Sequence, residues 1–178
     1  MGRLRSTLGV VMVTAMVSTA ASGQQREPTR STAPGPEYTG SAPATARLWQ
    51  EGDAGERLHL RGRVVDVDGS PVAGAEINLW QADGGGDYHE DRYRALLTTD
   101  QRGEFRLTTA VPGQYFGVKH IHLSITHPDH EYLTTRILFK GDPNLSDHDQ
   151  DLAILLEQVQ MDDQVVMLGS VEFVLQRF

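Results

Sequence analysis

The chain has 178 residues, a formal net charge of −8 and no cysteine. This length is sufficient for one domain with a hydrophobic core, and an acidic chain without a basic cluster in its body argues against nucleic acid as a partner. The absence of cysteine excludes disulfides, thiolate metal ligands and a cysteine nucleophile.

Residues 1–23 have the composition of a secretory signal peptide. Arg3 and Arg5 form a short basic region, an apolar stretch occupies residues 8–17, and small residues follow up to Gly23. Because the apolar stretch is too short to span a bilayer, we expect cleavage rather than a stable membrane anchor. The mature protein is therefore predicted to be secreted or periplasmic.

Residues 24–46 are rich in Pro, Ser, Thr, Gly and Ala. Such a composition is typical of flexible segments without a packed core, so we expect a linker here. The remaining residues, 47–178, are predicted to form one domain.

The predicted domain consists mainly of short strands separated by Gly- and Pro-containing turns. Apolar and polar residues alternate in several short runs, which is typical of half-buried strands. This pattern predicts an all-β protein with an antiparallel β-sandwich, whose strands we place at residues 58–66, 75–81, 93–98, 104–109, 120–125, 133–139 and 171–175.

One short helix is expected near the C-terminus, over residues 149–159. Four apolar residues in this stretch have the i, i+3, i+4, i+7 spacing of one helix face. They are Leu152, Leu155, Leu156 and Val159.

The predicted strand over residues 120–125 carries a His-x-His motif. Its apolar residues alternate with His120, His122 and Ser124. Because successive strand side chains point to opposite faces, the two histidines share a face, with Cβ atoms about 6–7 Å apart. Two imidazoles so placed can bind one metal ion. The alternative is a pair of solvent-facing histidines on an antiparallel strand.

Tyr88 and Tyr115 both come at the ends of predicted loops, after a Gly-rich stretch and after Pro112-Gly113 respectively. A tyrosine is ordinarily a neutral phenol, but a strongly charged cation can remove its proton. Phenolate is a hard anionic donor, and iron(III) is the biological ion that it suits best. The alternative for each tyrosine is a packed ring with a hydrogen-bonded hydroxyl.

Several segments, taken in order, resemble the intradiol ring-cleavage dioxygenases, in particular a secreted short form of the protocatechuate 3,4-dioxygenase type. The resemblance covers residues 58–178, and the segments together are far more specific than any one of them. They are residues 60–66, 69–72, 79–82, 85–88, 99–100, 103–105, 112–115, 120–122, 133–135 and 139–143.

The resemblance implies a β-sandwich that holds one non-haem iron(III). Tyr88, Tyr115, His120 and His122 match the four ligand positions of the family. It further implies that a catechol-type substrate binds the iron as a dianion and displaces Tyr115, which then serves as a local base. Reaction with O2 would cleave the ring between its two hydroxyl-bearing carbons and give a cis,cis-muconate. A homo-oligomer is possible, and the sequence does not fix the oligomeric state.

The chain departs from the family at a position that usually carries arginine, three residues before the first histidine. Here that position is Gly117. Arg136 or Lys119 could supply the missing charge, and we expect Arg136 to do so because strand alternation points Lys119 away from the histidines. The alternative is that Arg136 only pairs with a surface acid.

Other classes of protein fit parts of the pattern. A cupin also places His-x-His on a strand, but it adds a glutamate soon afterwards, and none follows His122 closely. A zinc enzyme could use His120, His122 and His148, but both tyrosines would then lack a role. A secreted transthyretin-like or carboxypeptidase-regulatory-like binding module shares the pattern of residues 62–72. A dioxygenase-like protein that binds aromatics without turnover also stays open.

Overall fold

The computed structural model describes residues 25–35 and 37–178. The predicted signal peptide therefore lies outside the described residues. Within them, no helix is long and apolar enough to cross a membrane.

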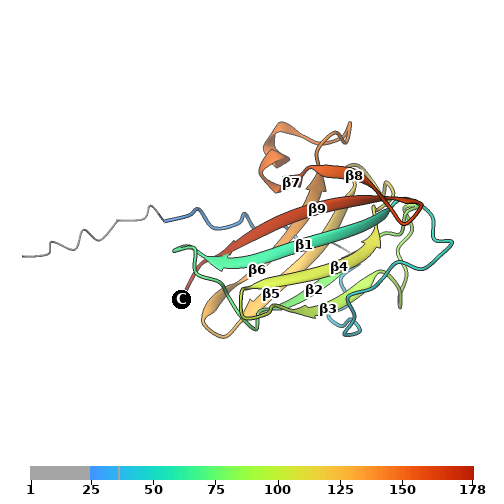
Figure 1. Cartoon of the computed structure of the whole chain (residues 1–178). Coiled ribbons are helices and arrows are strands. Elements are labelled where there is room, and N and C mark those ends of the chain that lie inside the picture. The colour runs from blue at the N-terminus through green and yellow to red at the C-terminus, as the bar shows by residue number, and fades with distance from the viewer. Residues whose placement is uncertain (1–24, 36) are drawn as a thin grey trace, which may run out of the picture.

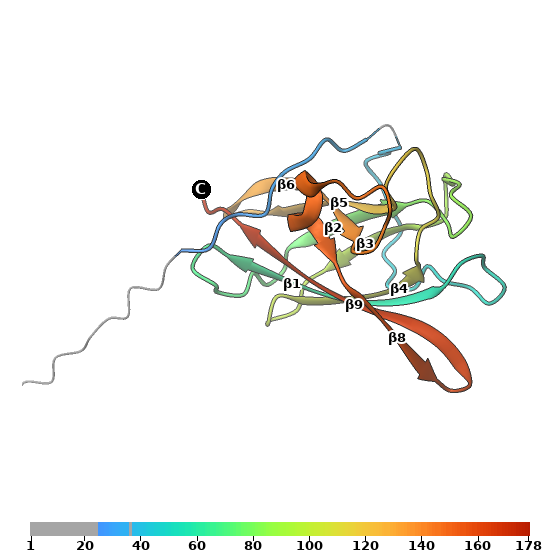
Figure 2. The same ribbon diagram turned by 90° about the horizontal axis from the view of Figure 1, so that it is seen from above.

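Two β-sheets form the molecule, and Figures 1 and 2 show them as two layers. The four-stranded sheet has the order β4-β1-β9-β8, and the five-stranded sheet has the order β3-β2-β5-β6-β7. The strands are β1 (Arg57–Asp66), β2 (Glu76–Gln81), β3 (Arg94–Thr98), β4 (Glu104–Ala110), β5 (His120–His127), β6 (His130–Phe139), β7 (Ala153–Ile154), β8 (Leu156–Met161) and β9 (Gln164–Leu175).

Most neighbouring strands pair antiparallel, as the sequence predicts, but β1 pairs with β9 and β6 with β7 in parallel. Alternate residues of both sheets meet in one core. From β5 the core receives Ile121, Leu123 and Ile125, all fully buried, and Leu58 and Leu60 of β1 belong to the same cluster. The predicted β-sandwich is thus confirmed, with two mixed sheets.

The helix predicted over residues 149–159 is wrong in its extent and type. Only η1 (Asp147–Leu152) is helical, and it is a 3₁₀-helix. The residues after it form β7 and β8, and β8 pairs with β9 along its full length. Ile154 and Leu156, two positions apart, pack against the core, whereas the side chain of Leu155 is 73% exposed. In this segment alternate side chains point to the core, as strand pairing requires, although the apolar residues also have helical spacing.

Residues 25–35 and 37–43, here called the N-terminal strap, differ from the expected linker. They form neither helix nor strand, yet they lie against the sandwich. Figure 2 shows the strap in blue along the outer side of the five-stranded sheet. The Thr29 N–H donates to the Val174 carbonyl at 2.9 Å, and the Thr32 N–H donates to the Thr134 carbonyl at 2.7 Å. The strap is therefore fixed to both sheets by backbone hydrogen bonds, which its composition does not predict.

Candidate metal centre

Strand β5 runs between β2 and β6, and it carries both predicted histidines on its outer face. His122 lies opposite Trp80 of β2 and Arg136 of β6. The rings of His120 and His122 are 4.4 Å apart between centroids, and the ring of His122 stacks on Trp80. The alternation of β5 therefore brings the two imidazoles together while its apolar residues fill the core.

The two predicted tyrosines reach the same place from separate loops. Tyr88 lies between β2 and β3, and Tyr115 lies between β4 and β5. The loops are tied together, because the Gly113 N–H donates to the Asp83 carbonyl at 2.7 Å. The tyrosine rings are 4.8 Å apart, edge to face, and the Tyr88 hydroxyl is 3.3 Å from Nε2 of His120.

These four side chains line one pocket of about 440 Å³. Its wall is completed from the strap, from the loop before β5 and from β6. The other lining residues are Ala33, Gly35, Glu37, Phe116 and Arg136. The structure thus gathers all five residues that the sequence singles out, and it adds the strap residues, which the sequence assigns to a linker.

Both histidines are in the neutral form, in which a ring nitrogen has a lone pair available for a metal ion. Nδ1 of His120 lies 2.8 Å from the Val118 carbonyl, which can only accept, so Nδ1 carries the proton and Nε2, which faces the Tyr88 hydroxyl, keeps its lone pair. Burial lowers the pKa of His120, and burial together with His120 and Arg136 lowers the pKa of His122 to about 3. Both imidazoles are therefore neutral at neutral pH, which is the form that binds metal ions.

The surroundings of His122 are consistent with a metal ligand. Its side chain is buried, yet Nδ1 has no hydrogen-bond partner. Gly35 of the strap lies so close that a Cβ there would be 3.0 Å from both Cε1 and Nε2 of the ring. A buried, unpaired ring nitrogen is uncommon in proteins, and such a group often marks a functional site or a bound ion.

The tyrosines are neutral phenols in this pocket unless a cation is added. Burial, with the Glu37 charge as the next cause, raises the pKa of Tyr88 to about 12. The pKa of Tyr115 is also raised, first by the loss of solvent around its hydroxyl and then by the Glu37 charge. In the part of the chain that the structure describes, no three His, Asp or Glu residues form a metal-binding group. A metal here would need the phenol oxygens, which argues for a hard, highly charged ion and against the zinc set with His148.

Arg136 lines the pocket beside His122, as expected, while the other charge candidate does not. One guanidinium nitrogen, Nη2, lies 4.0 Å from Asp149, and its buried Nε has no hydrogen-bond partner. Arg136 thus faces the pocket and also lies near an acid, so its position is compatible with either of the two alternatives. Lys119 is absent from the pocket lining. Gly117 is exposed, and a Cβ added to it would have no other atom within 4 Å.

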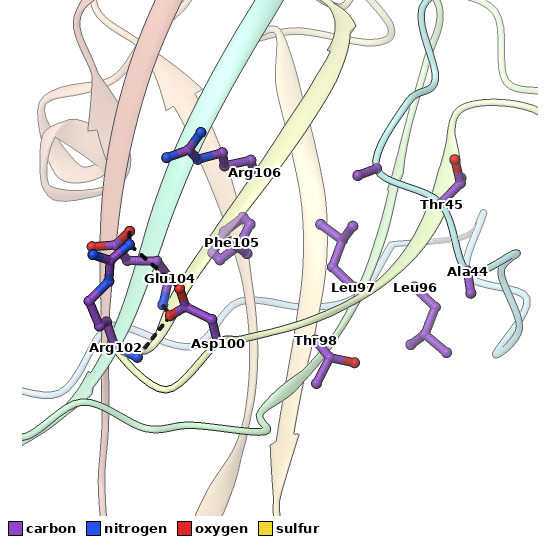
Figure 3. A pocket seen from close by; sticks show the side chains of 11 residues that line it. Ala44, Thr45, Leu96, Leu97, Thr98, Asp100, Arg102, Glu104, Phe105 and Arg106 are labelled. Atoms are coloured by element: carbon purple, nitrogen blue, oxygen red, sulfur yellow. Dashed lines mark hydrogen bonds and ion pairs between the residues drawn. The ribbon is translucent and has the colours of Figure 1, made fainter.

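A second hollow, of about 540 Å³, lies between residues 44–46, which follow the strap, and strands β3 and β4 (Figure 3). Three of its charged residues lie close together: Arg102 is 3.1 Å from Glu104 and 3.8 Å from Asp100. No histidine or tyrosine lines it. It therefore lacks the His and Tyr donors of the candidate metal centre.

Fold and pocket together define a class of protein, a β-sandwich with two histidines on one strand beside two loop tyrosines. A family model described as dioxygenase matches residues 33–169. The chain belongs to the intradiol dioxygenase family, as its resemblance predicts.

Individual relatives agree with this assignment. The chain is 31% identical over 140 residues to a catechol 1,2-dioxygenase from Pseudomonas sp. (strain EST1001), with 61% of this chain and 46% of that protein covered. The chain spans about half the length of the curated relatives it matches first.

Solved structures are similar in fold. Catechol 1,2-dioxygenase from Pseudomonas arvilla C-1 superposes with a TM-score of 0.78 at 28% identity, covering 84% of this chain and 62% of that one. The dioxygenase domain of a dioxygenase carbohydrate-binding protein fusion from Streptomyces sp. SirexAA-E gives a TM-score of 0.73 at 28% identity. There 85% of this chain and 100% of that domain are covered.

Proposed function

We propose that this protein is a non-haem iron(III) dioxygenase that cleaves a catechol-type ring between its hydroxyl-bearing carbons to give a cis,cis-muconate. The observation that carries the proposal is the meeting of Tyr88, Tyr115, His120 and His122 in one pocket. Family membership and the names of the relatives support it. They do not favour a non-catalytic, transthyretin-like binding module, which has no use for this set of residues.

In this proposal the chain contributes ligands, a base and a shaped cavity. His120 and His122 would hold the ion through neutral imidazoles, and Tyr88 through its phenol oxygen. A bound ferric ion would supply Lewis acidity toward the oxygens of a catechol. Tyr115 would be the fourth ligand, held as a phenolate, and once substrate displaces it that phenolate oxygen would accept a proton from a catechol hydroxyl. Arg136 faces the same space and stabilises negative charge that develops on the ring.

The metal is tested by elemental analysis and a visible spectrum of purified protein. We expect one iron per chain and a broad visible band from phenolate bound to ferric iron. His122→Ala should lose both, because a buried donor is removed, while His148→Ala, at an exposed residue of η1, should keep both. Stoichiometric zinc, with no visible band after iron is added, would contradict the proposal.

Secretion is part of the same proposal and rests on the composition of residues 1–23. N-terminal sequencing of exported protein should give a start between Ala20 and Gln25. An intact Met1 on periplasmic or secreted material would refute it.

A further inference from the structure

Glu37 is the strap residue whose charge faces the pocket, and its backbone is fixed from two sides. Its carbonyl accepts a hydrogen bond from Nη1 of Arg94 at 2.9 Å, and Arg94 is only 5% exposed. The ring of the next residue, Tyr38, packs on Trp80 at 4.8 Å between centroids. These two contacts fix the backbone at Glu37, and its side chain lines the pocket wall.

The Glu37 carboxylate lacks a cationic partner in the described part of the chain. None of its ion pairs includes Glu37. Its one side-chain hydrogen bond comes from the Tyr115 hydroxyl, at 3.4 Å. Glu37 lines the same pocket as Tyr88 and both histidines, so its charge faces the space that a catechol would occupy.

The cation on the pocket wall is in a different situation. Arg136 has Asp149 at 4.0 Å, and Asp149 in turn lies 3.0 Å from Arg30 of the strap. Arg136 thus belongs to a group of charges of both signs, whereas the Glu37 carboxylate forms no ion pair among the described residues and Arg94 contacts only its backbone carbonyl. A ring substituent entering the pocket meets an unpaired negative charge on the strap side.

We propose that Glu37 determines which ring substituents the pocket accepts. Catechols that carry a cationic or hydrogen-bond-donating substituent are preferred, and catechols that carry a carboxylate are disfavoured. The physical reason is that a partly desolvated charge attracts an opposite charge and repels a like charge much more strongly than it does in water. This inference rests on the proposed function and narrows its substrate class.

The experiment compares three ring substituents of similar size on the iron-loaded protein without oxygen. The probes are 3,4-dihydroxybenzylamine, 4-methylcatechol and 3,4-dihydroxybenzoate, which are cationic, neutral and anionic. Dissociation constants are measured from the change in the visible band and by calorimetry. The variants are Glu37→Gln, which removes the charge and keeps the shape, and Glu131→Gln, which makes the same change at an exposed residue of β6.

The wild-type protein should bind the amine most tightly and the benzoate least tightly. Glu37→Gln should lower the ratio of the benzoate to the amine dissociation constant at least about tenfold, with 4-methylcatechol changing little. Glu131→Gln should keep the wild-type ratio. An unchanged ratio in Glu37→Gln, with all three catechols still bound, would overturn this inference and leave the proposed function intact. A failure of every catechol to bind would overturn both.

Discussion

Arg136 is the residue that we propose supplies the charge missing at Gly117. It lies opposite His122 and lines the pocket, and its planar guanidinium offers several N–H donors to an anionic ring. We expect Arg136→Gln to lower kcat/KM for catechols about tenfold, which corresponds to about 1.4 kcal/mol of transition-state stabilisation. Iron content and colour should stay unchanged. Lys119→Gln is the control; a loss of activity in that variant alone would reverse the assignment.

Gly35 shows how closely the strap approaches the proposed metal ligands. Gly35→Ala adds a Cβ at 3.0 Å from the ring of His122, at a backbone φ of +81°. Gly40→Ala is a matched control, because Gly40 has a φ of +75° but no atom within 4 Å of its Cβ. Each change should destabilise the fold by about 1–2 kcal/mol.

Only Gly35→Ala should also release iron faster to a chelator, because it alone displaces the His122 ring. The measurement is the rate of loss of the visible band. Equal rates in the two variants would show that the contact has no effect on the metal.

At the scale of elements, the strap is held to η1 by a charged contact at Arg30. The guanidinium of Arg30 reaches Asp151 at 2.9 Å and Asp149 at 3.0 Å. Arg30→Ala should lower the free energy of unfolding by only about 1 kcal/mol or less, since the pairs are partly exposed. The Thr32 amide, which bonds to the Thr134 carbonyl, should exchange its hydrogen faster. Arg102→Ala, at an exposed ion pair elsewhere, should leave that amide protected.

The packing between neighbouring strands β1 and β4 requires a glycine. A Cβ on Gly62 would lie 1.9 Å from the ring of Phe105, which is nearly fully buried. Gly62→Ala should therefore destabilise the protein by about 2 kcal/mol, as overpacking does. Gly169→Ala in β9 meets only the ends of flexible Ile and Leu side chains, so its cost in denaturant unfolding should be smaller. An equal cost would contradict the steric explanation.

For the whole molecule, Asp66 links stability to pH. Burial would raise its pKa, but hydrogen bonds from the Ser70 and Asp68 N–H groups and the Arg177 guanidinium outweigh burial, and the pKa lies below its usual range. The stabilisation is thus complete above the unfolded pKa of about 4 and is lost as pH falls through the lower folded pKa. Chemical unfolding measured from pH 7 to pH 3 should show this loss, and Asp66→Asn should have a flatter profile.

The sequence by itself determined the class of fold and the ligand-bearing strand. Alternation is a local property, so the apolar residues of 120–125 identify both the strand and the face shared by His120 and His122. Loop position singled out Tyr88 and Tyr115, the family resemblance added Arg136, and the structure places all three in one pocket. Their roles as ligands and as a charge remain proposals.

Only the tertiary structure decided the course of the strap and of residues 153–161. Both are governed by partners distant in sequence: β8 by its pairing with β9, and the strap by hydrogen bonds to β6 and β9. The local sequence of a segment cannot predict which distant segments it pairs with. Glu37 and Tyr38 gave a faint signal, as the single charged and aromatic residues between positions 31 and 46. That Glu37 faces the pocket follows from the fold, because the sheet provides the surface on which the strap lies.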